Sequence, residues 1–425
     1  MKDCQQCAVN FLSYHGMYFK QIDPEQQLQK FLKEMQAGLR NEPCSLKMIP
    51  TYLRETAPKK EGPVIVLDIG GTHVRVAVVR LPKGQPPEIS DHLEFPTPGV
   101  DHAVSSREFF RTIADGLRPV IDRSSRIGVC FSFATKPMQN KDAIVVAGGK
   151  QLQVPDLLGN GVGECLRAGL REDGLDDQKS VVVINDSVAA TLGGRILHTD
   201  RCFSGYIGFI YGTGTNICYS EPQGFGGESM IINVESGAYC GFPSGDIDDR
   251  FDSSLIDVGQ DRFEKMVSGG YQGGLMTEIL RQAGKEQLFT PQCCEKIDEI
   301  NDLKPQEIDE FLNYPYGKGH LAMCCAGDDD RRTIYYLMDL VTERSALLSA
   351  ISLCASQLRA GIGKDPCRPA FITAEGSTFY FSKDFSRKLD YQMRRLGREN
   401  LGLYSEFFHV PNVTLAGTAI AGLSV

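Results

Sequence analysis

The stretch Leu67-Asp68-Ile69-Gly70-Gly71-Thr72-His73-Val74 joins two apolar runs through a pair of glycines. Residues 64–67 before it are Val, Ile, Val and Leu, and Val recurs through residues 74–81 after it. Two strands joined by a two-glycine turn are typical of a β-hairpin, because such a turn needs positive φ angles that glycine adopts at low cost. The stretch therefore predicts a hairpin in a buried sheet.

A second turn of the same kind, Gly212-Thr213-Gly214-Thr215-Asn216, separates apolar residues 206–211 from a strand at 216–220. The backbone N–H groups of a glycine turn form a concave nest for anions. Asp68 can hold Mg²⁺ through water at the first turn, and Thr72 can add a hydroxyl. Either turn alone could be a plain hairpin, but the pair favours phosphate binding. Neither turn matches the P-loop or dinucleotide-binding glycine patterns, which disfavours those folds.

Asp186 follows the β-branched run at 181–184 and precedes the helix-like residues 188–192. Open α/β sheets place their chemistry at such strand ends. Phosphoryl transfer to a hydroxyl needs a carboxylate that takes the proton and a magnesium ion that neutralises the phosphates. Asp186 is either this general base or a carboxylate that caps the helix, and the residues alone leave both open.

The bulk properties limit the class of protein. At 425 residues the chain is expected to form two lobes with a cleft between them. A net charge of -9 without a basic cluster argues against nucleic acid as a partner. The 14 cysteines are scattered through a long chain without an evident signal peptide, so we expect reduced thiols. No run of about 20 apolar residues occurs, so we expect no membrane span and a cytoplasmic location.

The chain alternates predicted strands and helices, which indicates an α/β fold. The helical spacing of apolar residues predicts helices at 25–39, 106–121, 263–280, 334–359 and 382–396, and apolar runs predict strands at 127–133 and 369–373. The small residues of 415–422 suit close helix packing.

Several stretches, in this order along the chain, resemble motifs of the hexokinase family. They are residues 33–39, 47–52, 67–75, 184–189, 212–219, 232–238, 263–269 and 374–380. The resemblance spans about residue 25 to the C-terminus. It implies a two-lobed actin-like, ribonuclease H-like fold, with a small lobe at 61–185 and a large lobe at 1–60 and 186–411. A C-terminal helix at about 412–425 would pack on the small lobe.

The resemblance also implies an activity and a set of site residues. The activity is an ATP-dependent hexokinase that phosphorylates the 6-hydroxyl of a hexose, with glucose preferred, ATP and Mg²⁺ as cofactors, and a monomer or dimer as the assembly. The catalytic residues would be Asp186, as general base, and Lys150. The sugar would be bound by Ser132, Asn185, Asn216, Glu235 and Glu264. The nucleotide would be bound by Asp68, Gly70, Gly71, Thr72, Arg75, Gly212, Thr213, Gly214, Gly376 and Ser377, and Asp68 would hold the metal through water.

The sequence departs from the family pattern around the sugar. Ala134 stands where the family usually has Pro, and Ala147-Gly148-Gly149-Lys150 stands where it has Ser-Trp-Thr-Lys. His73 replaces Asn, and Ser236 replaces Trp. These changes leave the preferred hexose open. They also keep two alternatives: a hexose-binding sensor without activity, and, more weakly, an acyl-phosphate or glycerol-type kinase.

Overall fold

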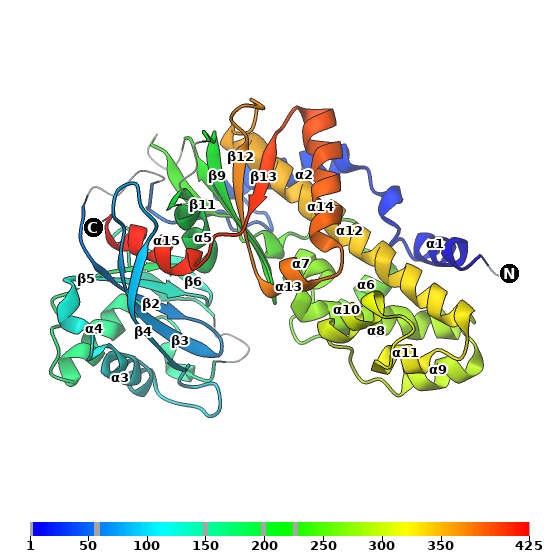
Figure 1. The fold of residues 1–425 in the computed structure, drawn as a ribbon, viewed down its shortest axis with the longest axis horizontal. Helices are drawn as coiled ribbons and strands as arrows, with labels where there is room; N and C mark the ends of the chain where they lie inside the picture. The colour runs from blue at the N-terminus through cyan, green and yellow to red at the C-terminus, as the bar shows by residue number, and fades with distance from the viewer. Residues whose placement is uncertain (1–2, 55–59, 148–151, 197–200, 224–227, 425) are drawn as a thin grey trace.

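The computed structural model describes residues 3–54, 60–147, 152–196, 201–223 and 228–424 (Figure 1). Within them, the chain forms two large β-sheets, each covered by helices, that lie side by side in the ribbon view, and one two-stranded sheet. The predicted α/β class in two lobes is confirmed.

The smaller sheet has the strand order β4-β3-β2-β5-β8. Its strands are β2 (Val64–Ile69), β3 (His73–Arg80), β4 (Glu88–Pro96), β5 (Arg126–Phe131) and β8 (Ser180–Ile184). The antiparallel pair β2 and β3 is the hairpin predicted around the first glycine turn, and β5 and β8 extend the sheet in parallel. Helices α3 (Ser106–Leu117) and α4 (Val162–Glu172) share a core with one face of this sheet. A short hairpin of β6 (Thr135–Pro137) and β7 (Ala143–Val145) lies beyond β5 in sequence.

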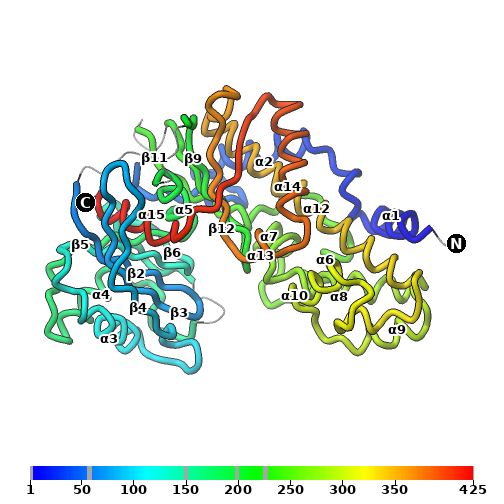
Figure 2. The backbone as a smooth tube through the Cα atoms, viewed as in Figure 1, coloured from blue at the N-terminus to red at the C-terminus, as the bar shows by residue number. Residues whose placement is uncertain are grey.

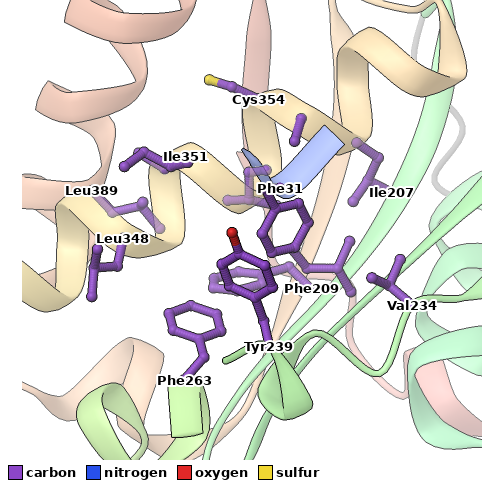
Figure 3. Close-up of a cluster of buried hydrophobic side chains, with 14 of the residues drawn as sticks. Phe31, Ile207, Phe209, Val234, Tyr239, Phe263, Leu348, Ile351, Cys354 and Leu389 are labelled. Atoms are coloured by element: carbon purple, nitrogen blue, oxygen red, sulfur yellow. The ribbon is translucent and has the colours of Figure 1, made fainter. Parts of the chain in front are cut away.

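The larger sheet has the order β1-β11-β10-β9-β12-β13. Its strands are β1 (Ile49–Pro50), β9 (Gly205–Tyr211), β10 (Thr215–Glu221), β11 (Met230–Asn233), β12 (Ala370–Glu375) and β13 (Ser405–Phe408). Its core is shared with α2 (Pro24–Leu39) and the long helix α12 (Asp328–Ala360). Figure 3 shows Phe31 of α2 and Tyr239 packed against each other in this core, with ring centroids 4.6 Å apart. Phe263 points into the same cluster, which anchors the segment that carries Glu264.

Two helices cross between the sheets. Helix α5 (Asp186–Gly193) and helix α15 (Val413–Gly422) pack so closely that a Cβ on Gly417 would lie 2.9 Å from the Cα of Ala189. This is the close packing predicted for residues 415–422. Helix α15 also contacts β2 and β5, and Figure 2 shows the C-terminal segment running back from the larger sheet to the smaller one. The two faces of β2 are therefore both covered, which explains its unbroken apolar run.

Most of the remaining helices pack together beyond the larger sheet, around α12 (Figure 1). They are α1 (Cys4–Tyr14), α6 (Asp246–Ser253), α8 (Gly269–Lys285), α9 (Pro291–Asp298), α10 (Pro305–Asn313) and α11 (His320–Cys324). Helix α7 (Arg262–Val267), which precedes α8, packs in the core of the larger sheet. Helices α13 (Ser377–Phe381) and α14 (Phe385–Gln392) follow β12. Among the described residues, no helix is long and apolar enough to cross a membrane. All 14 cysteines are described, and none of them is in a disulfide.

Two of the predicted helices are not continuous. The helix predicted at 263–280 is broken at Ser268, whose φ of -81° and ψ of 154° are extended, so that α7 ends before it and α8 begins after it. The helix predicted at 382–396 begins at Phe385 and passes into a π-helix at Met393–Asn400. Apolar spacing does not report such breaks, because the side chains on both sides can still face one core.

Candidate active site

The first glycine turn connects β2 to β3. Gly70 N donates to His73 O at 3.1 Å, and Thr97 ties the turn from β4 by donating from N to Thr72 O at 2.9 Å and from Oγ1 to Gly70 O at 2.8 Å. The predicted hairpin is present, but the reason given for its glycines is wrong. Neither Gly70 nor Gly71 adopts a left-handed φ angle.

Asp68 lies at the end of β2, directly before this turn, and pairs in register with Arg75 of β3. Arg75 Nη1 lies 3.7 Å from Asp68 Oδ2. Burial raises the pKa of the Asp68 carboxyl, and the charge of Arg75 opposes that rise. The structure thus brings together Asp68, Gly70 and Arg75 as predicted from the sequence.

The second glycine turn connects β9 to β10. Gly212 N donates to Gly214 O at 2.9 Å, which closes the turn. Gly376, at the end of β12, lies against this turn, because a Cβ on it would be 2.7 Å from Gly212 N. Gly376 has a φ of +114°, which L side chains rarely adopt. The structure therefore brings together the predicted nucleotide residues Gly212, Thr213, Gly214, Gly376 and Ser377.

Asp186 is the first residue of α5, and it follows β8, which runs parallel to β5 in the sheet that also holds Asp68. The cap of α5 is Asn185, whose Oδ1 accepts from Ser187 N at 3.0 Å and from Ser187 Oγ at 2.8 Å. Asn185 is therefore the N-cap residue of α5. The Oδ1 of Asp186 accepts from Ser187 N at 2.7 Å.

The environment of Asp186 changes its protonation. Burial raises the pKa of the Asp186 carboxyl to about 6, and the negative charges of Glu235 and Asp68 add to the rise, against the hydrogen bond from Ser187 N. A buried carboxyl whose pKa lies near the working pH is suited to proton transfer. Glu375, at the end of β12, also senses Asp186: burial, and then the charge of Asp186, raise its pKa to about 7.

A pocket of about 220 Å³ lies between the two lobes, and Asn185, directly before Asp186, is on its wall. Residues of the smaller lobe on its wall include Ser132, Ala134 and Asn185, and residues of the larger lobe include Lys47, Thr51, Asn233 and Glu235. Its lining is a mixture of amide, hydroxyl, carboxylate and apolar groups, which suits a small polyhydroxylated ligand.

An amide and carboxylate network lines the larger lobe's side of this pocket. Asn233 Nδ2 donates to Glu235 Oε1 at 2.8 Å, and Asn216 Nδ2 donates to Asn233 Oδ1 at 2.8 Å. Lys47 Nζ lies 3.3 Å from Glu235 Oε2. Glu235 itself has a left-handed φ of 54°, a strained position that often marks functional residues. The network therefore holds the predicted residues Asn216 and Glu235 together.

Asn233 and Lys47 were missed in the sequence. Asn233 ends β11 two residues before Glu235, inside the stretch 232–238 that resembles a hexokinase motif, so this proximity was the available signal. Lys47 lies far away in sequence and had no local signal.

Not all the predicted sugar residues are on this pocket wall, and Asn216 is linked to it through Asn233 and Glu235. Glu264 is not part of the pocket wall described above; it lies at the second glycine turn, where its Oε2 accepts from Thr215 N at 2.9 Å. Lys150, with Gly148 and Gly149, lies outside the described residues.

Residues 17–196 and residues 206–424 each match a family model described as hexokinase. The chain belongs to the hexokinase family. Hexokinase-1 of Mus musculus is 30% identical over 405 residues, which cover 87% of this chain and 41% of the mouse protein. A hexokinase of Schistosoma mansoni is 27% identical over 414 residues, which cover 89% of each chain.

The fold of this member of the hexokinase family also agrees with a solved structure. A hexokinase from Schistosoma mansoni complexed with glucose has a TM-score of 0.79 at 23% identity, and the match covers 100% of both chains. The chain spans less than half the length of the mammalian hexokinase-1 proteins that it matches.

Proposed function

We propose that this protein is an ATP-dependent hexokinase that transfers the terminal phosphoryl group of ATP to the 6-hydroxyl of a hexose, with glucose preferred. The observation that carries the proposal is the position of Asp186. It directly follows Asn185 on the pocket wall, and the charges of Glu235 on that wall and of Asp68 at the first glycine turn both raise the pKa of its carboxyl. Membership of the hexokinase family supports the same reaction.

Different residues of the chain have different roles in the proposed reaction. The sugar hydroxyls are bound by Asn185, Asn216, Glu235 and Glu264, and Ser132 contributes from the smaller lobe. The Asp186 carboxylate takes the proton of the sugar's 6-hydroxyl. The 6-oxygen of the sugar then forms a bond to the terminal phosphorus of ATP, and the bond from that phosphorus to the leaving ADP oxygen breaks. Backbone N–H groups of the two glycine turns hold the phosphates. Closure of the lobes excludes water, which limits ATP hydrolysis.

The residues at the first turn fit a magnesium ion that arrives with ATP. Within the described residues, no three His, Cys, Asp or Glu side chains lie close enough together to hold a metal by themselves. Mg²⁺ usually keeps several waters and is bound by one or two carboxylates together with substrate phosphates, which matches the buried Asp68 carboxyl. The ion would neutralise phosphate charge as the phosphoryl group moves.

A panel of sugars tests the proposal. ADP release is measured with glucose, mannose, fructose, glucosamine and N-acetylglucosamine, and sugar binding is measured separately by calorimetry. We expect turnover to require sugar and glucose to have the highest kcat/KM. Ala134 lies on the pocket wall at a position where the family usually has Pro, so the ranking of the other sugars shows whether this change alters the sugar preference.

A hexose sensor is the second candidate, favoured by the altered residues 147–149 of the sugar loop. Saturable glucose binding without turnover of any sugar would establish the sensor. A protein that binds none of the sugars would contradict both candidates.

The pH dependence of activity follows from Asp186. A base must be deprotonated to act, and the pKa of Asp186 is about 6, so kcat/KM is expected to fall about tenfold per pH unit below pH 6 and to level off above it. The profile is measured between pH 5 and pH 8 at constant ionic strength, and each sample is returned to neutral pH to exclude denaturation. A kcat/KM that stays constant down to about pH 5 would contradict this assignment.

A further inference from the structure

The joint between α7 and α8 holds the second glycine turn. Gly269 N donates to Gly212 O at 2.8 Å, and Gly270 N donates to Thr213 O at 2.9 Å. At the start of the turn, the hydroxyl of Tyr211, a fully buried residue, donates to Val267 O at 2.6 Å. We call residues 264–270 the turn clamp. Because Ser268 is extended, the N–H groups that open α8 are directed at the turn.

The fourth contact of the turn clamp comes from a side chain. Glu264 Oε2 accepts from Thr215 N at 2.9 Å, where the turn enters β10. The carboxylate lies so close that a Cβ on Gly214 would be 2.5 Å from Glu264 Oε2, and a Cβ on Gly237 would be 3.0 Å from it. The two glycines thus leave the room that this carboxylate occupies.

The two residues that flank Glu264 hold its backbone in place. Phe263 before it is fully buried in the core of the larger lobe, and Lys265 after it is also buried. Lys265 Nζ donates to Asp252 Oδ1 at 2.7 Å and to Asp257 O at 2.6 Å, and Gly259 N donates to Asp252 Oδ2 at 2.8 Å. A carboxylate held on both sides in this way is suited to positioning another group.

We propose that Glu264 is a positioning residue for the nucleotide as well as a sugar ligand: its carboxylate holds the backbone of the second glycine turn in the conformation that binds the phosphates. This inference rests on the proposed hexokinase function, which assigns the turn to ATP and Glu264 to the sugar. It adds that one side chain serves both sites. Charge-assisted hydrogen bonds from a backbone N–H to a carboxylate are stronger than neutral ones, so loss of this bond weakens the turn.

The matched control is Glu235, the other carboxylate assigned to the sugar. Within the described residues, its carboxylate contacts the side chains of Asn216, Asn233 and Lys47, and it does not accept from the backbone of the turn. Glu264→Ala and Glu235→Ala therefore each remove one sugar carboxylate, and only Glu264→Ala deprives Thr215 N of its acceptor. Glu264→Gln keeps an oxygen that can accept from Thr215 N.

The deciding measurement is the Kd of MgADP by calorimetry in the absence of sugar. We expect Glu264→Ala to raise this Kd about three- to tenfold, the effect of one lost hydrogen bond, whereas Glu264→Gln and Glu235→Ala stay close to wild type. Equal Kd values for Glu264→Ala and Glu235→Ala would overturn the inference. A wild-type protein that binds neither MgADP nor glucose would contradict the proposed function itself.

Tyr211→Phe provides a second, conservative test, because it keeps the buried ring and removes the hydroxyl that donates to Val267 O. We expect it to raise the KM for MgATP and leave the KM for glucose unchanged, whereas Glu264→Ala raises both and Glu235→Ala raises only the KM for glucose. A Tyr211→Phe variant with an unchanged KM for MgATP would show that the turn clamp does not position the turn.

Discussion

Replacement of Asp186 by Ala is expected to lower kcat about 100- to 10,000-fold, because the 6-hydroxyl then loses the group that takes its proton. Binding of glucose should remain, since Asn185, Asn216 and Glu235 are untouched. The measurements are kcat from ADP release and the Kd of glucose from calorimetry.

Asp186→Asn separates catalysis from structure. The amide keeps the size of the side chain and an oxygen that can accept from Ser187 N, as Asp186 does at 2.7 Å. If Asp186 only supports the start of α5, Asn should restore activity. We expect Asn to be as inactive as Ala with an unchanged melting temperature, and near-normal kcat in the Asn variant would contradict the assignment.

Gly376→Ala is expected to raise the Kd of MgADP more than tenfold. An added Cβ would lie 2.7 Å from Gly212 N, in the second glycine turn, and the φ of +114° would be strained for alanine. Strain of this kind costs about 1–3 kcal/mol, and relief requires the turn to move. The Kd of MgADP and the melting temperature should both change, while the Kd of glucose should not.

Gly402 offers the control for that substitution. It also has a positive φ, of +63°, but an added Cβ would meet nothing within 4 Å. Gly402→Ala should therefore destabilise the fold modestly and leave nucleotide binding at the wild-type level. Equal losses of MgADP affinity in the two variants would assign the effect of Gly376 to general destabilisation.

Much of the framework was predictable because its signals are local. A two-glycine turn between apolar runs specified both hairpins, and the change from the β-branched run at 181–184 to helical spacing placed Asp186 at the start of α5. Positive φ angles were predicted for Gly70 and Gly71 but are absent there. Glycine can also be required where another group lies too close for a Cβ atom. Gly214 shows that second use beside Glu264.

The break at Ser268 could not be predicted, because a helix that bends around a turn keeps the same apolar spacing. The resemblance to hexokinases suggested Glu264 as a sugar residue, but the sequence contained no sign that its carboxylate meets Thr215 N, 49 positions away. Lys47 likewise reaches Glu235 only through the pairing of β1 with β11.

The sequence by itself determined the α/β class, the two glycine turns, the strand end that presents Asp186 and the family of the protein. These depend on short-range patterns, since turn conformation, strand pairing across a hairpin and helix starts are decided by neighbouring residues. Only the tertiary structure decided which polar groups share a pocket, how burial raises the pKa of Asp186 to about 6, and which backbone groups hold the second turn. Those properties arise from contacts between distant segments, whose distances no local pattern specifies.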